Sequence, residues 1–180
     1  MWIFSKKHNL KDIGVFQGLT DCHSHILPGV DDGVKTMDES LAILDRYEQL
    51  GMKTVWLTPH IMEDVPNKTD DLRARFETLL QNYKGGLTLH LGAENMIDNL
   101  FEERLKDGDL LTVGSEHDRL LVETSYFTPP YGFYDILETI KTKGLFPILA
   151  HPERYIYMSE KDYDRLKSMG VLFQMNLFSL

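Results

Sequence analysis

The sequence predicts an α/β fold in which parallel strands form a β/α barrel. Short β-rich runs alternate with segments of helical period, and this alternation indicates parallel strands joined by right-handed crossovers. A polar side chain also ends every strand candidate. Such convergence is typical of the catalytic face of a barrel, whereas an open sheet concentrates its site at one switch point. These strand-end residues are His25, His60, Glu94, Glu123, His151 and Asn176.

The expected elements follow one another in a regular order. The strand candidates are residues 18–25, 53–60, 87–94, 119–124, 145–151 and 171–176. Helices are expected between them, from Thr36 to Gly51 and at about residues 70–84, 97–106, 134–143 and 159–169. Six units are fewer than the usual eight, which need roughly 250 residues. The length of 180 residues favours a single domain over residues 1–180.

The helix that follows the first strand has the clearest limits. Thr36 and Glu39 have the spacing of a capping box, in which each side chain accepts a hydrogen bond from a backbone N–H at the helix start. The apolar residues that follow, Leu44 among them, share one stripe, and Gly51 supplies a stop.

The composition narrows the class of protein. The formal net charge is −9, with 19 basic against 28 acidic residues, which argues against nonspecific binding of nucleic acid. The longest apolar runs are too short for membrane insertion, and the N-terminus does not have the order of a signal peptide. A single cysteine, Cys22, fits a reducing compartment. We therefore expect a cytoplasmic protein.

The first candidate metal ligands lie in and just after the first strand. His23 and His25 have the spacing that points both imidazoles to one side of a strand. A bare His-x-His is a weak signal, because two surface histidines would look the same. The acidic turn that follows, with Asp32, favours a metal site.

Four later strand ends extend this set. His60 and His151 each adjoin a proline, and Glu94 and Glu123 each follow an apolar run. A buried carboxylate needs a metal ion or a salt-bridge partner, so a lysine or arginine partner is the alternative. Mixed imidazole and carboxylate ligands suit manganese, iron or zinc. The predicted metal ligands are His23, His25, Asp32, His60, Glu94, Glu123 and His151.

Other residues receive individual interpretations. Arg154 carries a planar fork of donors that suits a phosphate or a carboxylate. Tyr126 and Phe127 either form a wall for an aromatic substrate or pack as a hydrophobic loop on a helix. Cys22 is expected to be a small core residue rather than a nucleophile.

The remaining histidines are expected to lie outside the site. His90 is expected to pack in the core, and His8 and His117 to lie on the surface.

Together the motifs resemble those of a known family. Asp-x-His-Ser-His-Ile-(x)4-Asp-Asp-Gly, Thr-Pro-His, Gly-Ala-Glu, Leu-Val-Glu-Thr and Leu-Ala-His-Pro-Glu-Arg occur here in the order seen in PHP-domain phosphoesterases. The sequence is most similar to the bacterial manganese-dependent protein tyrosine phosphatases of the CpsB/CapC family, which accompany capsule and exopolysaccharide synthesis. The resemblance covers Asp21 to Asn176.

The resemblance implies a PHP-type distorted β/α barrel that holds up to three Mn²⁺ ions. At matching positions it implies the same seven metal ligands and gives Arg154 a phosphate-contacting, catalytic role. It also implies a phosphotyrosyl protein as substrate, namely a bacterial tyrosine kinase. We expect Tyr126 to contact the substrate.

One departure from the family pattern affects these expectations. The family continues past this point into a further helix and strand that carry its last aspartate and histidine ligands, whereas this chain stops at Leu180. We therefore expect a barrel that is incomplete at its C-terminus, incomplete metal binding and an exposed apolar edge that favours homo-oligomers. Two alternatives stay open, a phosphoesterase for a small molecule such as histidinol phosphate and a non-catalytic metal-binding fragment.

Overall fold

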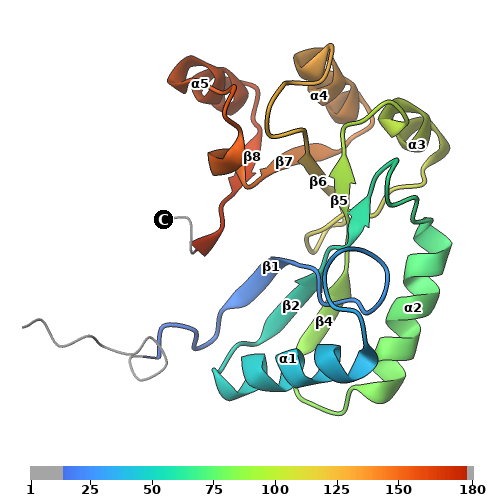
Figure 1. The fold of residues 1–180 in the computed structure, drawn as a ribbon. Coiled ribbons are helices and arrows are strands. Elements are labelled where there is room, and N and C mark those ends of the chain that lie inside the picture. Colours follow the sequence, from blue (N-terminus) through green and yellow to red (C-terminus); the bar gives the residue numbers. More distant parts are fainter. Residues whose placement is uncertain (1–13, 178–180) are drawn as a thin grey trace, which may run out of the picture.

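A computed structural model describes residues 14–177 and confirms an α/β fold built on parallel strands (Figure 1). The prediction for His8 lies outside these residues. Every ladder between the named strands is parallel. The strands are β1 (Thr20–Ser24), β2 (Thr54–Leu57), β3 (His60–Ile61), β4 (Thr88–Leu91), β5 (Glu94–Met96), β6 (Arg119–Glu123), β7 (Phe146–Ala150) and β8 (Leu172–Gln174). The helices are α1 (Met37–Gln49), α2 (Thr69–Asn82), α3 (Phe101–Asp107), α4 (Phe133–Thr142), the 3₁₀ helix η1 (Pro152–Arg154) and α5 (Glu160–Ser168).

Two predicted strands are each broken into two. Residues 53–60 form β2 and β3, and residues 87–94 form β4 and β5, so the strands fall into a sheet of order β1-β2-β4 and a sheet of order β3-β5-β6-β7-β8. The first break falls at Pro59, which has no N–H for a ladder. The second falls at Gly92, where a Cβ would lie 2.5 Å from a side-chain carbon of Val113, so only glycine fits.

The two sheets nevertheless follow one another without a gap in their hydrogen bonding. The Gly92 N–H donates to the Leu57 carbonyl at 2.9 Å, and the Glu94 N–H donates to the Pro59 carbonyl at 3.0 Å. The breaks correct the prediction in one respect, because His60 and Glu94 begin new strands instead of ending old ones. They therefore lie inside the sheet wall rather than at its rim.

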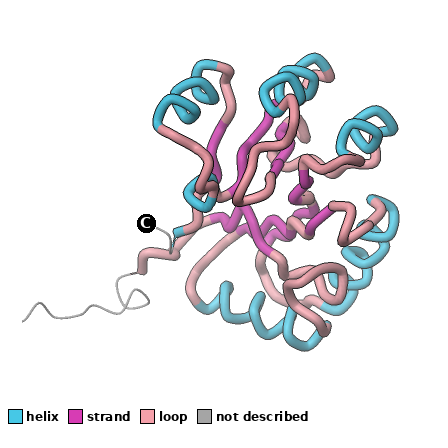
Figure 2. The backbone as a smooth tube through the Cα atoms, turned by 45° about the horizontal axis from the view of Figure 1, so that its top comes forward, coloured by secondary structure: helices cyan, strands magenta, loops and turns pink. Residues whose placement is uncertain are grey.

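The helices cover the outer side of the strands, which lie at the centre of the molecule (Figure 2). Leu44 of α1 and Leu72 of α2 pack in one apolar cluster with Val55 of β2. A second cluster joins α3, α4 and α5 to β6 and β7. A third, smaller cluster that contains Trp56 and Leu121 joins β2, β6 and β7. The sheet is therefore packed by apolar side chains over most of its length.

The predicted helices are present with small shifts of their limits. At the start of α1, Thr36 accepts a hydrogen bond from the Glu39 N–H, and the Glu39 side chain accepts from the Thr36 N–H. The capping box is therefore confirmed. The helix expected from about residue 97 begins at Phe101, because β5 runs to Met96 and the next residues form a turn in which the Leu100 N–H donates to Asp98.

The strand ladders do not close a ring within residues 14–177. Among the described strands, β1 pairs only with β2, and β8 pairs only with β7. The finding therefore supports the coarser statement of the prediction, a parallel α/β fold. No helix in the described part of the chain is both long and apolar enough to cross a bilayer.

Replacing a fully buried leucine of α1 will destabilise the fold. Leu44 has no exposed surface, so we expect Leu44→Ala to lower the free energy of unfolding by about 2–5 kcal/mol. Urea denaturation followed by circular dichroism measures this change. Leu80→Ala is the matched control, because Leu80 also lies on a helix but is 38% exposed. Equal losses in the two variants would contradict the packing described here.

Candidate metal centre

The seven predicted ligands lie around one cleft. His25, Glu123 and His151 lie at or just after the carboxyl ends of β1, β6 and β7, whereas His60 and Glu94 are the first residues of β3 and β5. Parallel strands bring their carboxyl ends to the same edge, which explains how residues so distant in sequence meet. The cleft has a volume of about 210 Å³. Its lining residues are His23, His25, Asp32, His60, Glu94, Tyr126, His151, Arg154 and Asn176. The seventh predicted ligand, Glu123, lies just behind His60, 2.7 Å from its Nδ1.

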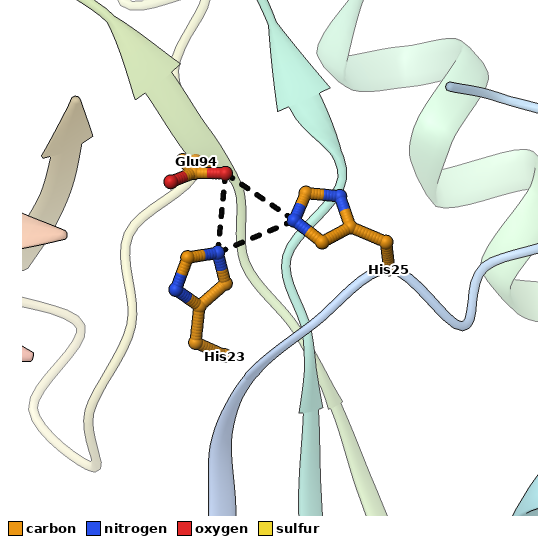
Figure 3. Close-up of side chains that lie close together, drawn as sticks. All are labelled: His23, His25 and Glu94. Atoms are coloured by element: carbon orange, nitrogen blue, oxygen red, sulfur yellow. Dashed lines mark hydrogen bonds and ion pairs between the residues drawn. The ribbon is translucent and has the colours of Figure 1, made fainter. Parts of the chain in front are cut away.

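Glu94 lies close to four of the histidines, two of which, His23 and His25, are drawn with it in Figure 3. Its side chain is fully buried, and its Oε2 lies 3.1 Å from His23 Nε2 and 3.3 Å from His25 Nε2. The same oxygen is 3.2 Å from His60 Nδ1, and Oε1 is 2.7 Å from His151 Nε2. One carboxylate therefore faces four imidazole rings that come from three different parts of the chain.

Ligand atoms of six of the seven predicted ligands fall into three overlapping groups, in each of which they lie within 4.8 Å of one another. Glu94, His25 and His60 each belong to two of them. Only the carboxylate, with its two oxygens, could contribute to two neighbouring ions, because a neutral imidazole has a single free lone pair. The groups are His23, His25 and Glu94; His25, Asp32 and His60; and His60, Glu94 and Glu123.

The chemistry of these donors fits metal ions better than it fits a salt-bridge network. Within residues 14–177, the ion-pair partners of Glu94 and Glu123 are histidines, and no lysine or arginine pairs with either. Glu94 Oε2 and Glu123 Oε1 are buried without a hydrogen bond of good geometry. A buried charge without a partner is costly, and a divalent cation would remove that cost for both carboxylates.

The carboxylates and imidazoles of the cluster shift one another's pKa values. Burial disfavours the His25 imidazolium, but hydrogen bonds to Asp31 and Glu94 raise the pKa of His25 to about 10. Burial likewise favours neutral Glu94, yet the hydrogen bond from His151 and the nearby His23 and His25 hold its pKa well below the usual range. A metal ion must therefore displace a proton from at least one ring.

Asp31 is a contributor that the sequence prediction missed. Its side chain is fully buried, and Oδ2 lies 2.8 Å from His25 Nδ1. It also accepts hydrogen bonds from the backbone N–H groups of His60 and Gly33. Asp31 thus orients the His25 ring so that Nε2 faces the cluster. The signal was the Asp-Asp-Gly turn, of which only the second carboxylate was chosen.

Asp32, the predicted ligand of that turn, lies at the rim of the cluster. Its side chain is 82% exposed, and Oδ1 is 3.5 Å from His60 Nε2. The turn itself needs glycine at the next position, since a Cβ on Gly33 would lie 2.3 Å from the His25 carbonyl oxygen. The tight turn brings both aspartates back toward the histidines.

The mouth of the cleft carries a cation and an aromatic ring. Arg154 Nη1 donates to the Tyr126 hydroxyl at 3.2 Å, and both residues line the cleft. They meet because His151 adopts a left-handed backbone (φ 32°) that turns the chain sharply into η1. Phe127 is 71% exposed, so the alternative of a hydrophobic loop packed on a helix is wrong for this residue.

The other individual predictions have mixed outcomes. Cys22 is exposed instead of buried in the core, because β1 has a strand neighbour on one side only in the described part of the chain. His90 is half-buried and stacks on Trp56 with ring centroids 4.6 Å apart. His117 is exposed, as predicted.

Fold and cluster together define a class, the parallel α/β proteins with a histidine–carboxylate centre at the carboxyl ends of their strands. The sequence places the chain more narrowly within it. Residues 19–180 match the family described as "Capsular polysaccharide synthesis, CpsB/CapC". The chain belongs to this family, which confirms the resemblance.

Relatives with assigned names support the same placement. The chain is 30% identical over 140 residues to the "Putative tyrosine-protein phosphatase CapC" of Staphylococcus aureus, covering 76% of this chain and 54% of that protein. It is 28% identical over 166 residues to the "Tyrosine-protein phosphatase CpsB" of Streptococcus pneumoniae, covering 89% of this chain and 68% of that protein. The chain thus spans about half to two thirds of the length of these relatives.

A solved structure has the same fold. It belongs to a study of YwqE from Bacillus subtilis and CpsB from Streptococcus pneumoniae, described there as "unique metal-dependent tyrosine phosphatases". The TM-score is 0.77 at 25% sequence identity, and the match covers 87% of this chain and 66% of the other.

We expect a bound divalent metal ion to stabilise the folded protein, with Mn²⁺ as the probe. At a concentration about 100 times the dissociation constant, a ligand that binds only the folded state raises the free energy of unfolding by about 2.7 kcal/mol. Thermal denaturation with Mn²⁺ or with EDTA measures this gain. We expect it to be lost in His23→Ala and kept in His90→Ala, since His90 lies outside the cluster. A gain that persists in His23→Ala would place the ions elsewhere.

Proposed function

We propose that this chain is a metal-dependent phosphoesterase that hydrolyses phosphotyrosine in proteins. The main observation that supports this function is the cleft, in which a buried histidine–carboxylate cluster lies beneath an arginine and a tyrosine. Names of the relatives support the reaction class. The proposal includes a PHP-type distorted β/α barrel as the architecture and residues 1–180 as a single PHP domain.

The proposed cofactor is Mn²⁺, with up to three ions. Four imidazoles and three carboxylates are a donor set that manganese accepts, and iron and zinc share this preference. When bound, the ions would supply Lewis-acid activation of the phosphate and of a nucleophilic water. The proposed ligands are His23, His25, Asp32, His60, Glu94, Glu123 and His151.

The protein's own part is to hold these ligands and to bind the substrate. Asp31 orients His25, and burial of Glu94 and Glu123 keeps bulk water away from the deep side of the centre. At the open side, Arg154 offers two or more N–H donors to phosphate oxygens and offsets the charge that develops on them. Tyr126, 37% exposed, offers an aromatic face to the phenol ring of the substrate.

No protein nucleophile is required by this arrangement. Cys22 is exposed and is not among the residues that line the cleft. Water is therefore the proposed nucleophile, and the phosphate is released without a covalent enzyme intermediate.

The proposed substrate is a phosphorylated bacterial tyrosine kinase of capsule or exopolysaccharide synthesis, which the enzyme would oppose in the cytoplasm. The family description supports the link to capsular polysaccharide, and the relatives' names support phosphotyrosine. The net charge of −9 disfavours nucleic acid as a partner.

Hydrolysis of a phosphotyrosyl peptide during a Mn²⁺ titration tests the proposal. We expect metal-dependent release of phosphate, and His25→Ala should reduce it by more than the roughly 10- to 100-fold that loss of an outer-shell partner causes. Cys22→Ser should be as active as the unmodified chain.

Two results would contradict this reading. Faster turnover of histidinol phosphate than of the peptide would make the chain a small-molecule phosphatase. Folded, metal-loaded protein without turnover of either compound would make it a non-catalytic metal-binding fragment.

Removal of Arg154 will impair catalysis without loss of metal. Arg154→Ala should lower kcat by about 100- to 1,000-fold, as loss of a donor to a developing negative charge does. Arg154→Lys should recover part of this, because lysine keeps the charge but not the fork. Steady-state kinetics with the peptide measures both variants, and Tyr126→Phe is the control that removes the hydrogen bond to Arg154 but keeps the ring. Unchanged kcat in Arg154→Ala would exclude the role.

A further inference from the structure

Gln174 makes a set of contacts that no part of the proposed mechanism uses. It is the last residue of β8, and its side-chain Oε1 lies 2.7 Å from His23 Nδ1 of β1. The same oxygen accepts a hydrogen bond from the His151 backbone N–H at 3.3 Å. Its Nε2 donates to Asn176 Oδ1 at 3.2 Å. A single amide thus contacts two of the proposed metal ligands.

These contacts determine which nitrogen of His23 carries a proton. The His151 backbone N–H can only donate, so the atom of Gln174 that faces it must be the amide oxygen. An amide oxygen can only accept, and therefore His23 Nδ1 must be the donor in the second contact. In the neutral ring this leaves the lone pair on Nε2, the atom that lies 3.1 Å from Glu94 Oε2.

The position of Gln174 in the sheet gives this contact a second consequence. Within residues 14–177, β1 is an edge strand of the three-stranded sheet and β8 is an edge strand of the five-stranded sheet, and the two share no ladder. Gln174 therefore links the two edges through a side chain, where neighbouring strands would be linked by their backbones. The end of β8 is held in turn by Glu153, whose Oε1 accepts from the Asn176 N–H at 3.2 Å.

We propose that Gln174 is a positioning residue of the metal centre, which fixes the Nδ1–H tautomer and the ring orientation of His23 from across the open edge. The inference rests on the metal centre of the proposed function. It predicts that the affinity of the centre for metal depends on a hydrogen-bond acceptor at position 174, the last residue of β8. Outer-shell acceptors of this kind orient ligand imidazoles, and their loss costs about 10- to 100-fold in metal affinity.

Three variants separate the acceptor from its packing. Gln174→Met keeps the length of the side chain and removes the acceptor, whereas Gln174→Glu keeps an acceptor oxygen. Gln81→Met makes the same chemical change on the exposed face of α2 and is the control. Calorimetric titration with Mn²⁺ alone gives the affinity and the number of sites, and long-range ¹H–¹⁵N spectra of the protein with and without Zn²⁺ give the tautomer of His23.

The expected result is a Mn²⁺ dissociation constant about 10- to 100-fold higher in Gln174→Met, with Gln174→Glu and Gln81→Met close to the unmodified chain. A protected Nδ1–H signal of His23 should be present in the unmodified chain and in Gln174→Glu, and lost in Gln174→Met.

Equal affinity in Gln174→Met and the unmodified chain would overturn the inference. So would equally weak binding by Gln174→Glu, which would reduce the role to packing. An Nε2–H tautomer of His23 in the unmodified chain would also overturn it, even if Gln174→Met fails to fold. Tight Mn²⁺ binding without phosphotyrosine hydrolysis would contradict only the proposed function, whereas absence of Mn²⁺ binding to the unmodified chain would overturn both.

Discussion

The carboxylate of Glu94 imposes the strongest constraint on this molecule. A fully buried negative charge is tolerated only where cations or donors surround it, and here four imidazoles do so. These rings come from three different segments, which must meet at the same point. Three features bring the rings together around Glu94: the strand order, the Asp-Asp-Gly turn and the left-handed backbone of His151.

The breaks in the sheet explain how the carboxylate comes to lie among four imidazoles. If residues 87–94 formed one strand, Glu94 would lie at its end, beside solvent. The break at Gly92 starts a new strand instead, between β3 and β6, and four imidazoles surround the carboxylate. The irregularity that divides the two sheets therefore places Glu94 among these rings. Pro59 and Gly92 belong to the architecture of the site as much as its ligands do.

Much of this could be predicted from the sequence, because the signals are local. The capping box at Thr36 and the apolar stripe through Leu44 lie within one helix. The metal cluster could be predicted because each ligand lies at the boundary of an apolar run, and parallel strands gather such boundaries at one edge. The strand breaks could not be predicted, since the need for Gly92 arises from a contact with Val113, a residue of another segment.

The two outer-shell partners show the same division between local and distant information. Asp31 contacts His25 from six residues away. It lies in the Asp-Asp-Gly turn, whose composition already indicated a role for its carboxylates. Gln174 reaches His23 across 151 positions, and nothing near Gln174 in the sequence distinguishes it from any polar residue of an edge strand. Only the folded chain shows that its amide oxygen faces an obligate donor. The tautomer of His23 thus depends on the tertiary structure, and it cannot be predicted from the local sequence around His23.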